Sequence, residues 1–252
     1  MKKIIWLFII IAFTTCKDDT DCCVNLETVD ITLKFTHNWD GTPVTASDFN
    51  SFNYVTENGE SVSIERLRYV LSNILFNNNV QSSNLYKLVD LNNNDTEIII
   101  KNIPLININS LSFTFGFSDA DNIDGVYQDL NTASFNVPGM LGGGYHYMQF
   151  DGKYKDTNNI DANFNYHAIR AVNRSDPNNL IFEDTSFLVD FGSVTITNNA
   201  TIEIKMNIAE WFKNPNTWDL NQLNTVLMPN FEAQKLISAN GKSVFSLGDI
   251  LQ

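Results

Sequence analysis

Residues 138–170, with the sequence PGMLGGGYHYMQFDGKYKDTNNIDANFNYHAIR, hold the most informative pattern in the chain. Three consecutive glycines at positions 142–144 lead into an aromatic-rich strand, which a polar turn joins to a second strand. A glycine run lets the backbone bend sharply or approach another group closely. The same stretch contains His146 and His167, two of the three histidines of the chain. We therefore expect a functional site here, although the pattern alone specifies no reaction.

The two strands of this stretch can pair as an antiparallel hairpin, in which opposed residues face the same side of the sheet. In one register the aromatic side chains form a continuous apolar face, which pairs Phe150 with Phe164 and turns His146 and His167 to opposite faces. A register shifted by one residue brings the two histidines together but opposes Phe150 to Asn163. Burial favours the first register, so the hairpin alone is expected to keep the histidines apart.

Strand-like runs of apolar residues, several of them alternating with polar ones, recur along the rest of the chain. The clearest are residues 29–35, 62–76, 85–91, 110–117, 187–191 and 200–206. There is no strand–helix–strand alternation, internal repeat or change of composition, which predicts a single all-β domain, an antiparallel β-sandwich, over residues 29–252. One short helix is expected at residues 207–215, because Asn207 can cap its N-terminus and Pro215 can end it.

The composition narrows the classes of function and partner. The formal net charge of −13 over 252 residues argues against nucleic acid and against anionic membrane surfaces as partners. The chain has no Gly-x-Ser-x-Gly elbow, phosphate-binding loop or His-Glu-x-x-His motif. We therefore do not expect an enzyme, and the composition specifies no protein or small-ligand partner.

The N-terminus has the features of a bacterial lipoprotein signal. Residues 2 and 3 are lysines, and an apolar run at residues 4–13 is too short to span a bilayer. A loose cleavage box ends at Cys16, and the Lys-Asp-Asp that follows resembles the export signal of many Bacteroidetes outer-membrane lipoproteins. We predict a signal peptide at residues 1–15, a lipid anchor on Cys16 and an acidic tether at residues 16–28. The expected location is the outer membrane, with the protein exposed at the cell surface; the alternative is an ordinary secreted protein.

The two remaining cysteines, Cys22 and Cys23, are neighbours in the tether. Adjacent cysteines form at best a strained disulfide, and two thiolates are too few for a structural zinc site. We therefore expect the fold to be held together by burial of its core and not by a disulfide framework.

Several segments, in order, resemble the MbnP-like family, β-sandwich proteins associated with copper and methanobactin handling that include many Bacteroidetes lipoproteins. The matching pieces are residues 35–37 (FTH), 67–75 (LRYVLSNIL), 115–118 (FGFS), 144–152 (GYHYMQFDG), 209–215 (AEWFKNP) and 237–240 (ISAN) with Phe245. The resemblance implies a β-sandwich and copper binding. In copper-binding members an oxidised tryptophan, from a Met-Tyr-Trp-x-Trp segment, joins histidines around the metal. The corresponding residues 140–145, MLGGGY, contain no tryptophan.

Two hypotheses of function follow from this resemblance and its gap. In the first, His37, His146 and His167 supply imidazoles to copper or another transition metal, since neutral imidazole is a ligand of both copper and zinc. In the second, the missing tryptophans mark a metal-free β-sandwich that serves as a binding or scaffold module at the cell surface.

A second candidate site is the acidic stretch that follows the strand at residues 110–117. Asp119, Asp121 and Asp124 precede Gly125, and a short turn rich in oxygen ligands can bind calcium. The spacing differs by one residue from the usual calcium loop, and an acidic turn between strands is the alternative.

Overall fold

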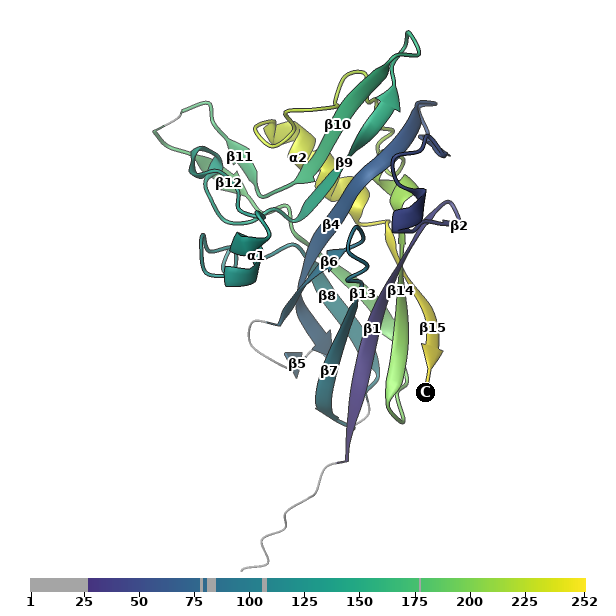
Figure 1. The fold of residues 1–252 in the computed structure, drawn as a ribbon. Coiled ribbons are helices and arrows are strands. Elements are labelled where there is room, and N and C mark those ends of the chain that lie inside the picture. The colour runs from purple at the N-terminus through teal and green to yellow at the C-terminus, as the bar shows by residue number, and fades with distance from the viewer. Residues whose placement is uncertain (1–26, 78, 81–84, 106–107, 177) are drawn as a thin grey trace, which may run out of the picture.

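The computed structural model describes residues 27–252 except residues 78, 81–84, 106–107 and 177 (Figure 1). The predicted signal peptide, the lipidation site at Cys16 and the tether up to residue 26 lie outside these residues. Two large β-sheets share the main hydrophobic core. This arrangement confirms the predicted all-β sandwich.

The five-stranded sheet is built around its first strand. It contains β15 (Phe245–Leu251), β14 (Ala200–Asn207), β1 (Thr28–Trp39), β7 (Glu97–Pro104) and the two-residue β2 (Thr42–Pro43). β1 pairs with β7 in the antiparallel sense but with β14 in the parallel sense, so this sheet is mixed. Buried and more exposed residues alternate strictly along β1, as its sequence pattern predicts.

The eight-stranded sheet is organised along the long strand β4. Its main path contains β10 (Asp161–Ala168), β9 (Met148–Lys155), β4 (Ser61–Phe76), β8 (Ser110–Phe115) and β13 (Phe187–Ser193). Three short strands also pair with β4, namely β3 (Tyr54–Val55), β5 (Asn79–Val80) and β6 (Tyr86–Asp90). A separate two-stranded sheet joins β11 (Ala171–Asn173) to β12 (Ile181–Glu183).

Helical segments connect and cover the sheets. They are the 3-10 helices η1 (Ala46–Asp48), η2 (Gly139–Leu141) and η3 (Ile208–Phe212) and the α-helices α1 (Gln128–Thr132) and α2 (Phe231–Gly241). The helix expected at residues 207–215 is present as η3, and the Asn207 side chain caps it by accepting a hydrogen bond from the backbone N–H of Ala209. The longer helix α2, before the last strand, has no counterpart among the sequence-based expectations.

The core between the sheets is rich in aromatic side chains. Phe35 of β1 packs edge to face on Tyr69 of β4 and on Phe113 of β8, with ring centroids 6.4 and 6.3 Å apart. All three rings are almost fully buried. Burial of one such side chain contributes on the order of 2–3 kcal/mol, so stacking of the two inner faces stabilises the sandwich.

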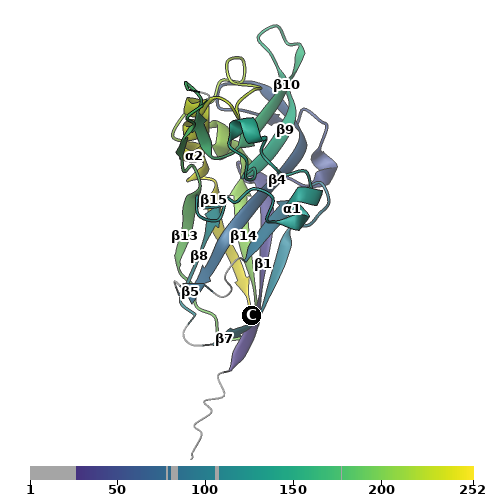
Figure 2. The ribbon, with the colours of Figure 1, turned by 90° about the vertical axis from the view of Figure 1, so that its left-hand side faces the viewer.

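The outer face of the eight-stranded sheet, which points away from the five-stranded sheet, is partly covered. In both views α1 lies beside β4 on this outer side, and β11 and β12 lie beyond the ends of β9 and β10 (Figure 1, Figure 2). A small second apolar cluster forms under these segments, from Val137, Leu141, Ile169 and Val172, with Leu180 and Met228 packed against it. This outer layer frames the site described below.

The register of the β9–β10 hairpin differs from the predicted one. Phe150 lies opposite Tyr166, and Phe164 lies opposite Gly152 instead of Phe150. The apolar and polar faces are still the expected ones, but the pairing is shifted by two residues. Gly152 explains the shift, because the ring of Phe164 occupies the space that a side chain at this position would fill.

Candidate functional site

Two polar rows cross the outer face of the eight-stranded sheet, on β4, β9 and β10. In register, one row is Arg68, Gln149 and His167, and the next is Arg66, Asp151 and Asn165. Side chains of a strand alternate between faces, so these residues share the outer side while their neighbours fill the core. Arg68 donates a hydrogen bond through Nε to Oε1 of Gln149, at 2.8 Å, which ties the first row together.

The glycine run (residues 142–144) brings a further histidine over these rows. All three glycines have positive φ, at +94°, +66° and +79°. A Cβ at Gly144 would lie 2.5 Å from Oδ1 of Asn122, so both the conformation and the packing require glycine. The chain then passes through His146 before β9 begins at Met148.

His146 and His167, hereafter the histidine pair, are in direct contact. Their ring centroids are 5.2 Å apart and the rings are nearly perpendicular, at 82°. The expectation that they face opposite sides of the hairpin is therefore wrong. Alternation along a strand holds only within the strand, and His146 lies in the irregular segment before β9, where the backbone bends.

His146 is almost fully buried, at 5% exposure, and both of its ring nitrogens have neighbours. Nδ1 lies 2.8 Å from the backbone carbonyl of Phe135, which can only accept a hydrogen bond, so Nδ1 carries the hydrogen. Nε2 lies 3.2 Å from the sulfur of Met228. Burial lowers the pKa of His146 to about 4, so the ring is neutral at pH 7 and Nε2 has a free lone pair.

His167 is held from below by a carboxylate. Its Nε2 donates to Oδ1 of Asp151 at 2.8 Å, and Asp151 also accepts hydrogen bonds from Asn165 and Arg66. Burial by itself would raise the pKa of Asp151, but the hydrogen bond from His167 and the contacts with Asn165 and Arg66 bring it down to about 2. In the neutral ring Nδ1 then carries the lone pair, and no hydrogen bond to Nδ1 is found within the described part of the chain.

His37 does not join the pair. It lies on β1, in the five-stranded sheet, and its Nε2 is 3.1 Å from the hydroxyl of Tyr69 inside the sandwich. Among the described residues, no three histidine, cysteine or acidic side chains are grouped so that they could hold a metal ion. Of the three predicted histidines the structure brings together His146 and His167, while the alternation of β1 turns His37 into the core.

The three aspartates of the acidic stretch do not converge on one point, and one of them binds the backbone of the glycine run. Asp121 accepts hydrogen bonds from Ser118 and Asn73, and Asp124 accepts one from the backbone N–H of Gly144 at 3.2 Å. Asp119 lies 3.5 Å from Arg170. The three predicted calcium ligands thus hold different neighbours, and among the described residues no three histidine, cysteine or acidic side chains are grouped there to hold a metal ion. The alternative, an acidic turn, describes this segment.

Two residues of the site, Met228 and Asp151, were not predicted from the sequence. Met228 precedes α2 and reaches the pair only because Gln234 of α2 binds the end of β10: it accepts from the N–H of Ile169 and donates to the carbonyl of His167. No local pattern in the sequence marks this contact. Asp151 could have been predicted from the sequence. It lies two residues after Gln149 on β9, so both side chains point to the same outer face, beside β10.

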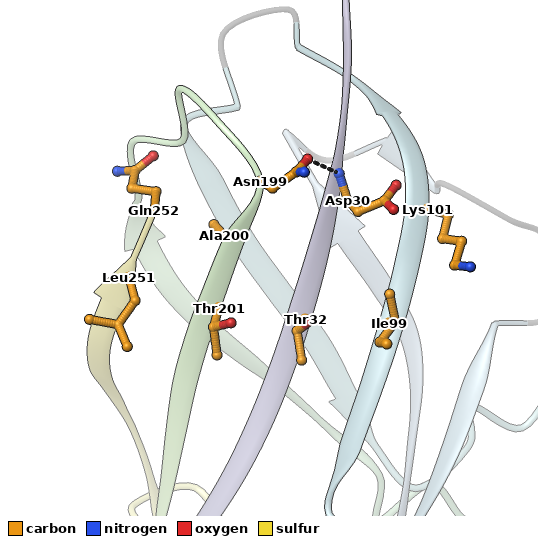
Figure 3. A pocket seen from close by; sticks show the side chains of 9 residues that line it. All are labelled: Asp30, Thr32, Ile99, Lys101, Asn199, Ala200, Thr201, Leu251 and Gln252. Carbon is orange, nitrogen blue, oxygen red and sulfur yellow. Dashed lines mark hydrogen bonds between the residues drawn. The ribbon is translucent and has the colours of Figure 1, made fainter.

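A larger hollow lies elsewhere and has a different character. It has a volume of about 630 Å³ on the outer face of the five-stranded sheet, where Ile99, Thr32, Thr201 and Leu251 form one row across four strands (Figure 3). None of the predicted site residues lines it, and no histidine does. Its lining includes the carboxylate of Asp30 and the amine of Lys101 but no imidazole or sulfur that would suit a transition metal, so the histidine pair remains the candidate site.

Fold and site together define a β-sandwich protein with a buried histidine pair on the outer face of one sheet. The chain belongs to the MbnP family, whose model matches residues 28–229, and this confirms the resemblance found in the sequence. A solved structure, MbnP from Methylosinus trichosporium, is similar at 10% identity and a TM-score of 0.49, over 76% of this chain and 80% of that one. No curated protein matches significantly. In the described residues, no helix is both long enough and apolar enough to cross a membrane.

Proposed function

We propose that this protein binds copper, or another transition metal, through the histidine pair. The observation that carries the proposal is the 5.2 Å contact between the two rings, in which each ring has one nitrogen fixed by a hydrogen-bond acceptor. Each neutral ring therefore keeps a lone pair on its second nitrogen, and this lone pair can bind a metal ion. Neutral imidazole is a common ligand of copper and zinc.

The surroundings of the two rings fit a metal ligand set. Metal-binding histidines usually donate their other N–H to a carbonyl or a carboxylate, which fixes the ring and makes it a better electron donor. Phe135 supplies the carbonyl for His146, and Asp151 supplies the carboxylate for His167. A bound copper ion would supply one-electron redox chemistry or be carried as cargo, while the chain's own groups orient the rings and limit access of water.

We also propose that the protein is a lipoprotein, anchored through Cys16 in the outer membrane and exposed at the cell surface. The support is the sequence of residues 1–19, with its short apolar run, its cleavage box and its Lys-Asp-Asp signal. Binding, and not catalysis, is the proposed activity, because the sequence contains no Gly-x-Ser-x-Gly elbow, phosphate-binding loop or His-Glu-x-x-His motif.

Metal content and a copper titration of the purified full-length chain test the first proposal. Three variants are compared with the unaltered chain, namely His146→Gln, His167→Gln and, as a matched control, His37→Gln. We expect one copper per chain, loss of more than about 100-fold in affinity in the first two variants, and unchanged binding in the third, because loss of an outer-shell partner alone typically lowers affinity about 10–100-fold. Absence of copper and zinc from the unaltered chain at neutral pH would refute metal binding and leave the metal-free binding module.

The anchor is tested separately. Mass spectrometry of the protein purified from membranes should show acylated Cys16 as the first residue, and a Cys16→Ser variant should leave the membrane fraction. Protease added to intact cells should digest the mature protein. A soluble, unmodified protein would instead support the secreted alternative.

A further inference from the structure

We infer that Met228 is a third ligand of the metal held by the histidine pair, and that its thioether makes the site select copper(I) over zinc(II) and copper(II). The inference rests on the proposed function and names the ion that the site takes. It starts from a contact that ordinary hydrogen bonding does not explain. Nε2 of the buried His146 and the sulfur of the half-buried Met228 are 3.2 Å apart.

Both atoms of this contact are electron-pair donors. Nδ1 of His146 must carry the ring hydrogen, since it faces a carbonyl oxygen, and a thioether has no hydrogen to give. A hydrogen between nitrogen and sulfur would require a doubly protonated ring. Burial of the ring, at 5% exposure, opposes that charged form. Two lone pairs facing each other in a buried place are stabilised by a cation that accepts both.

The chemistry of the sulfur indicates which cation. Thioether is a soft, neutral ligand that suits copper(I), whereas copper(II) favours nitrogen and oxygen donors in a tetragonal arrangement. Zinc is held by thiolate, imidazole and carboxylate ligands. Asp151, the carboxylate found beside the pair among the described residues, is already engaged by His167, Asn165 and Arg66. The ligands that remain free are two imidazole nitrogens and one sulfur.

The electrostatics of the surroundings favour an ion of low charge. Arg68 lies in the same row as His167 and is hydrogen-bonded to the neutral side chain of Gln149, so its charge repels a cation bound at the pair, whereas the charge of Arg66 is paired with Asp151. That repulsion is twice as large for a divalent ion as for a monovalent one. Met228 also packs on the small apolar cluster of the outer layer, which disfavours a strongly hydrated divalent ion.

The chain holds Met228 at this place from two sides. The Asn230 side chain caps the start of α2 by accepting from the N–H of Ala233. Gln234, in the first turn of α2, donates both to the carbonyl of Leu227 and to the carbonyl of His167, at 3.1 and 2.9 Å. One buried amide thus links the backbone beside Met228 to the backbone of a ligand histidine, so the sulfur is positioned and does not merely fill space.

The test uses the full-length chain with Cys16→Ser, Cys22→Ser and Cys23→Ser, so that methionine is the only sulfur present. Met228→Leu keeps the volume and apolar packing of the side chain. Met140→Leu is the matched control, because it makes the same change at an exposed methionine beside the glycine run. Copper(I) affinity is measured by competition with a chromophoric chelator, zinc(II) affinity in parallel, and X-ray absorption detects sulfur bound to copper.

We expect one sulfur ligand in the copper(I) protein, its loss in Met228→Leu, and a fall of about 10- to 100-fold in copper(I) affinity with less than about a twofold change for zinc(II). Met140→Leu should behave as the unaltered chain. Copper without bound sulfur, or sulfur retained in Met228→Leu, would overturn the inference and leave the histidine pair as a metal site. Zinc binding tighter than copper(I) binding would do the same. Failure to bind either metal would remove the proposed function and this inference together.

Discussion

Two buried histidines, His37 and His146, differ in whether the atom next to Nε2 can form a hydrogen bond with it. In the inner site, Nε2 of His37 lies 3.1 Å from the hydroxyl of Tyr69, which can both donate and accept and so complements either tautomer of the ring. In the outer site, Nε2 of His146 meets the sulfur of Met228, an acceptor matched to an acceptor. Burial lowers the pKa of both histidines to about 4, so depth does not distinguish them. What distinguishes the two histidines is whether the partner of Nε2 is complementary to it.

This difference separates a structural role from a ligand role. A buried histidine with a complementary partner stabilises the fold without a metal. A buried histidine with an uncompensated lone pair stabilises the empty protein less and gains when a cation arrives. The variants below test whether stability and metal binding divide between the two sites in this way.

The largest expected effect is on the backbone that presents His146. Gly144→Ala should lower the free energy of unfolding by about 3 kcal/mol, from the strain of φ at +79° and from the overlap of the new Cβ with Asn122. Copper affinity should fall as well, because the bend that carries His146 is displaced. Chemical denaturation and copper titration measure the two effects.

Gly125→Ala is the control for this change. Gly125 has nearly the same φ, +76°, but no atom lies within 4 Å of the Cβ position. It should therefore show only the conformational cost of about 1 kcal/mol and bind copper normally. Equal behaviour of the two variants would show that the packing of the glycine run on Asn122 does not matter.

The next effect concerns the carboxylate under His167. Asp151→Asn keeps the shape of the side chain but removes its charge, so copper affinity should fall about 10- to 100-fold. Asp161→Asn makes the same change in the same hairpin, at an exposed carboxylate paired with Lys155, and should leave affinity unchanged. If both variants bind copper as the unaltered chain does, Asp151 does not act on the metal through His167.

The sequence was sufficient for the architecture where burial alone decides the structure. The alternation of β1 follows directly from residues 29–35, and Asn207 marks the start of η3. Helix α2 escaped because its buried face is not an apolar stripe. Two of its buried residues, Gln234 and Asn240, are polar and hydrogen-bond to backbone carbonyls of other segments.

The sequence indicated where the site lies but not which residues come together there. The glycines next to His146 indicated an unusual backbone, yet only the three positive φ angles in succession turn the ring toward His167. The hairpin register depended on Gly152, whose missing side chain makes room for Phe164. Met228 comes from a distant segment of the chain, and such contacts follow from tertiary packing that no local period encodes.

Acid should weaken the fold through the inner site, and the sign follows from the direction of the pKa shift. His37 is neutral in the folded state down to about pH 4, whereas the unfolded chain takes up a proton near pH 6.5. Stability is therefore complete above pH 6.5 and decreases as the pH falls toward 4. Between pH 7 and pH 5, His37 should contribute a loss of about 2 kcal/mol.

His37→Gln removes this titrating group and keeps an acceptor for Tyr69. Its free energy of unfolding should change about 2 kcal/mol less than that of the unaltered chain between pH 7 and pH 5, as measured by urea denaturation of the metal-free protein at each pH. The loss that persists in this variant is assigned to His146, whose pKa is lowered in the same direction. An unchanged pH dependence would mean that His37 has the same pKa in the folded and the unfolded protein.

The smallest effect isolates the inner site from the metal. Tyr69→Phe removes the hydroxyl and leaves Nε2 of His37 without its hydrogen-bond partner, which should lower the free energy of unfolding by about 1 kcal/mol. Copper affinity should not change, because Tyr69 faces the core and the histidine pair lies on the opposite face of the sheet. Met228→Leu should give the reverse result, with copper(I) affinity reduced and unfolding little affected. If Tyr69→Phe also weakened copper binding, the two histidine environments would be coupled through β4, and complementarity of partners would no longer separate structural from ligand histidines in this fold.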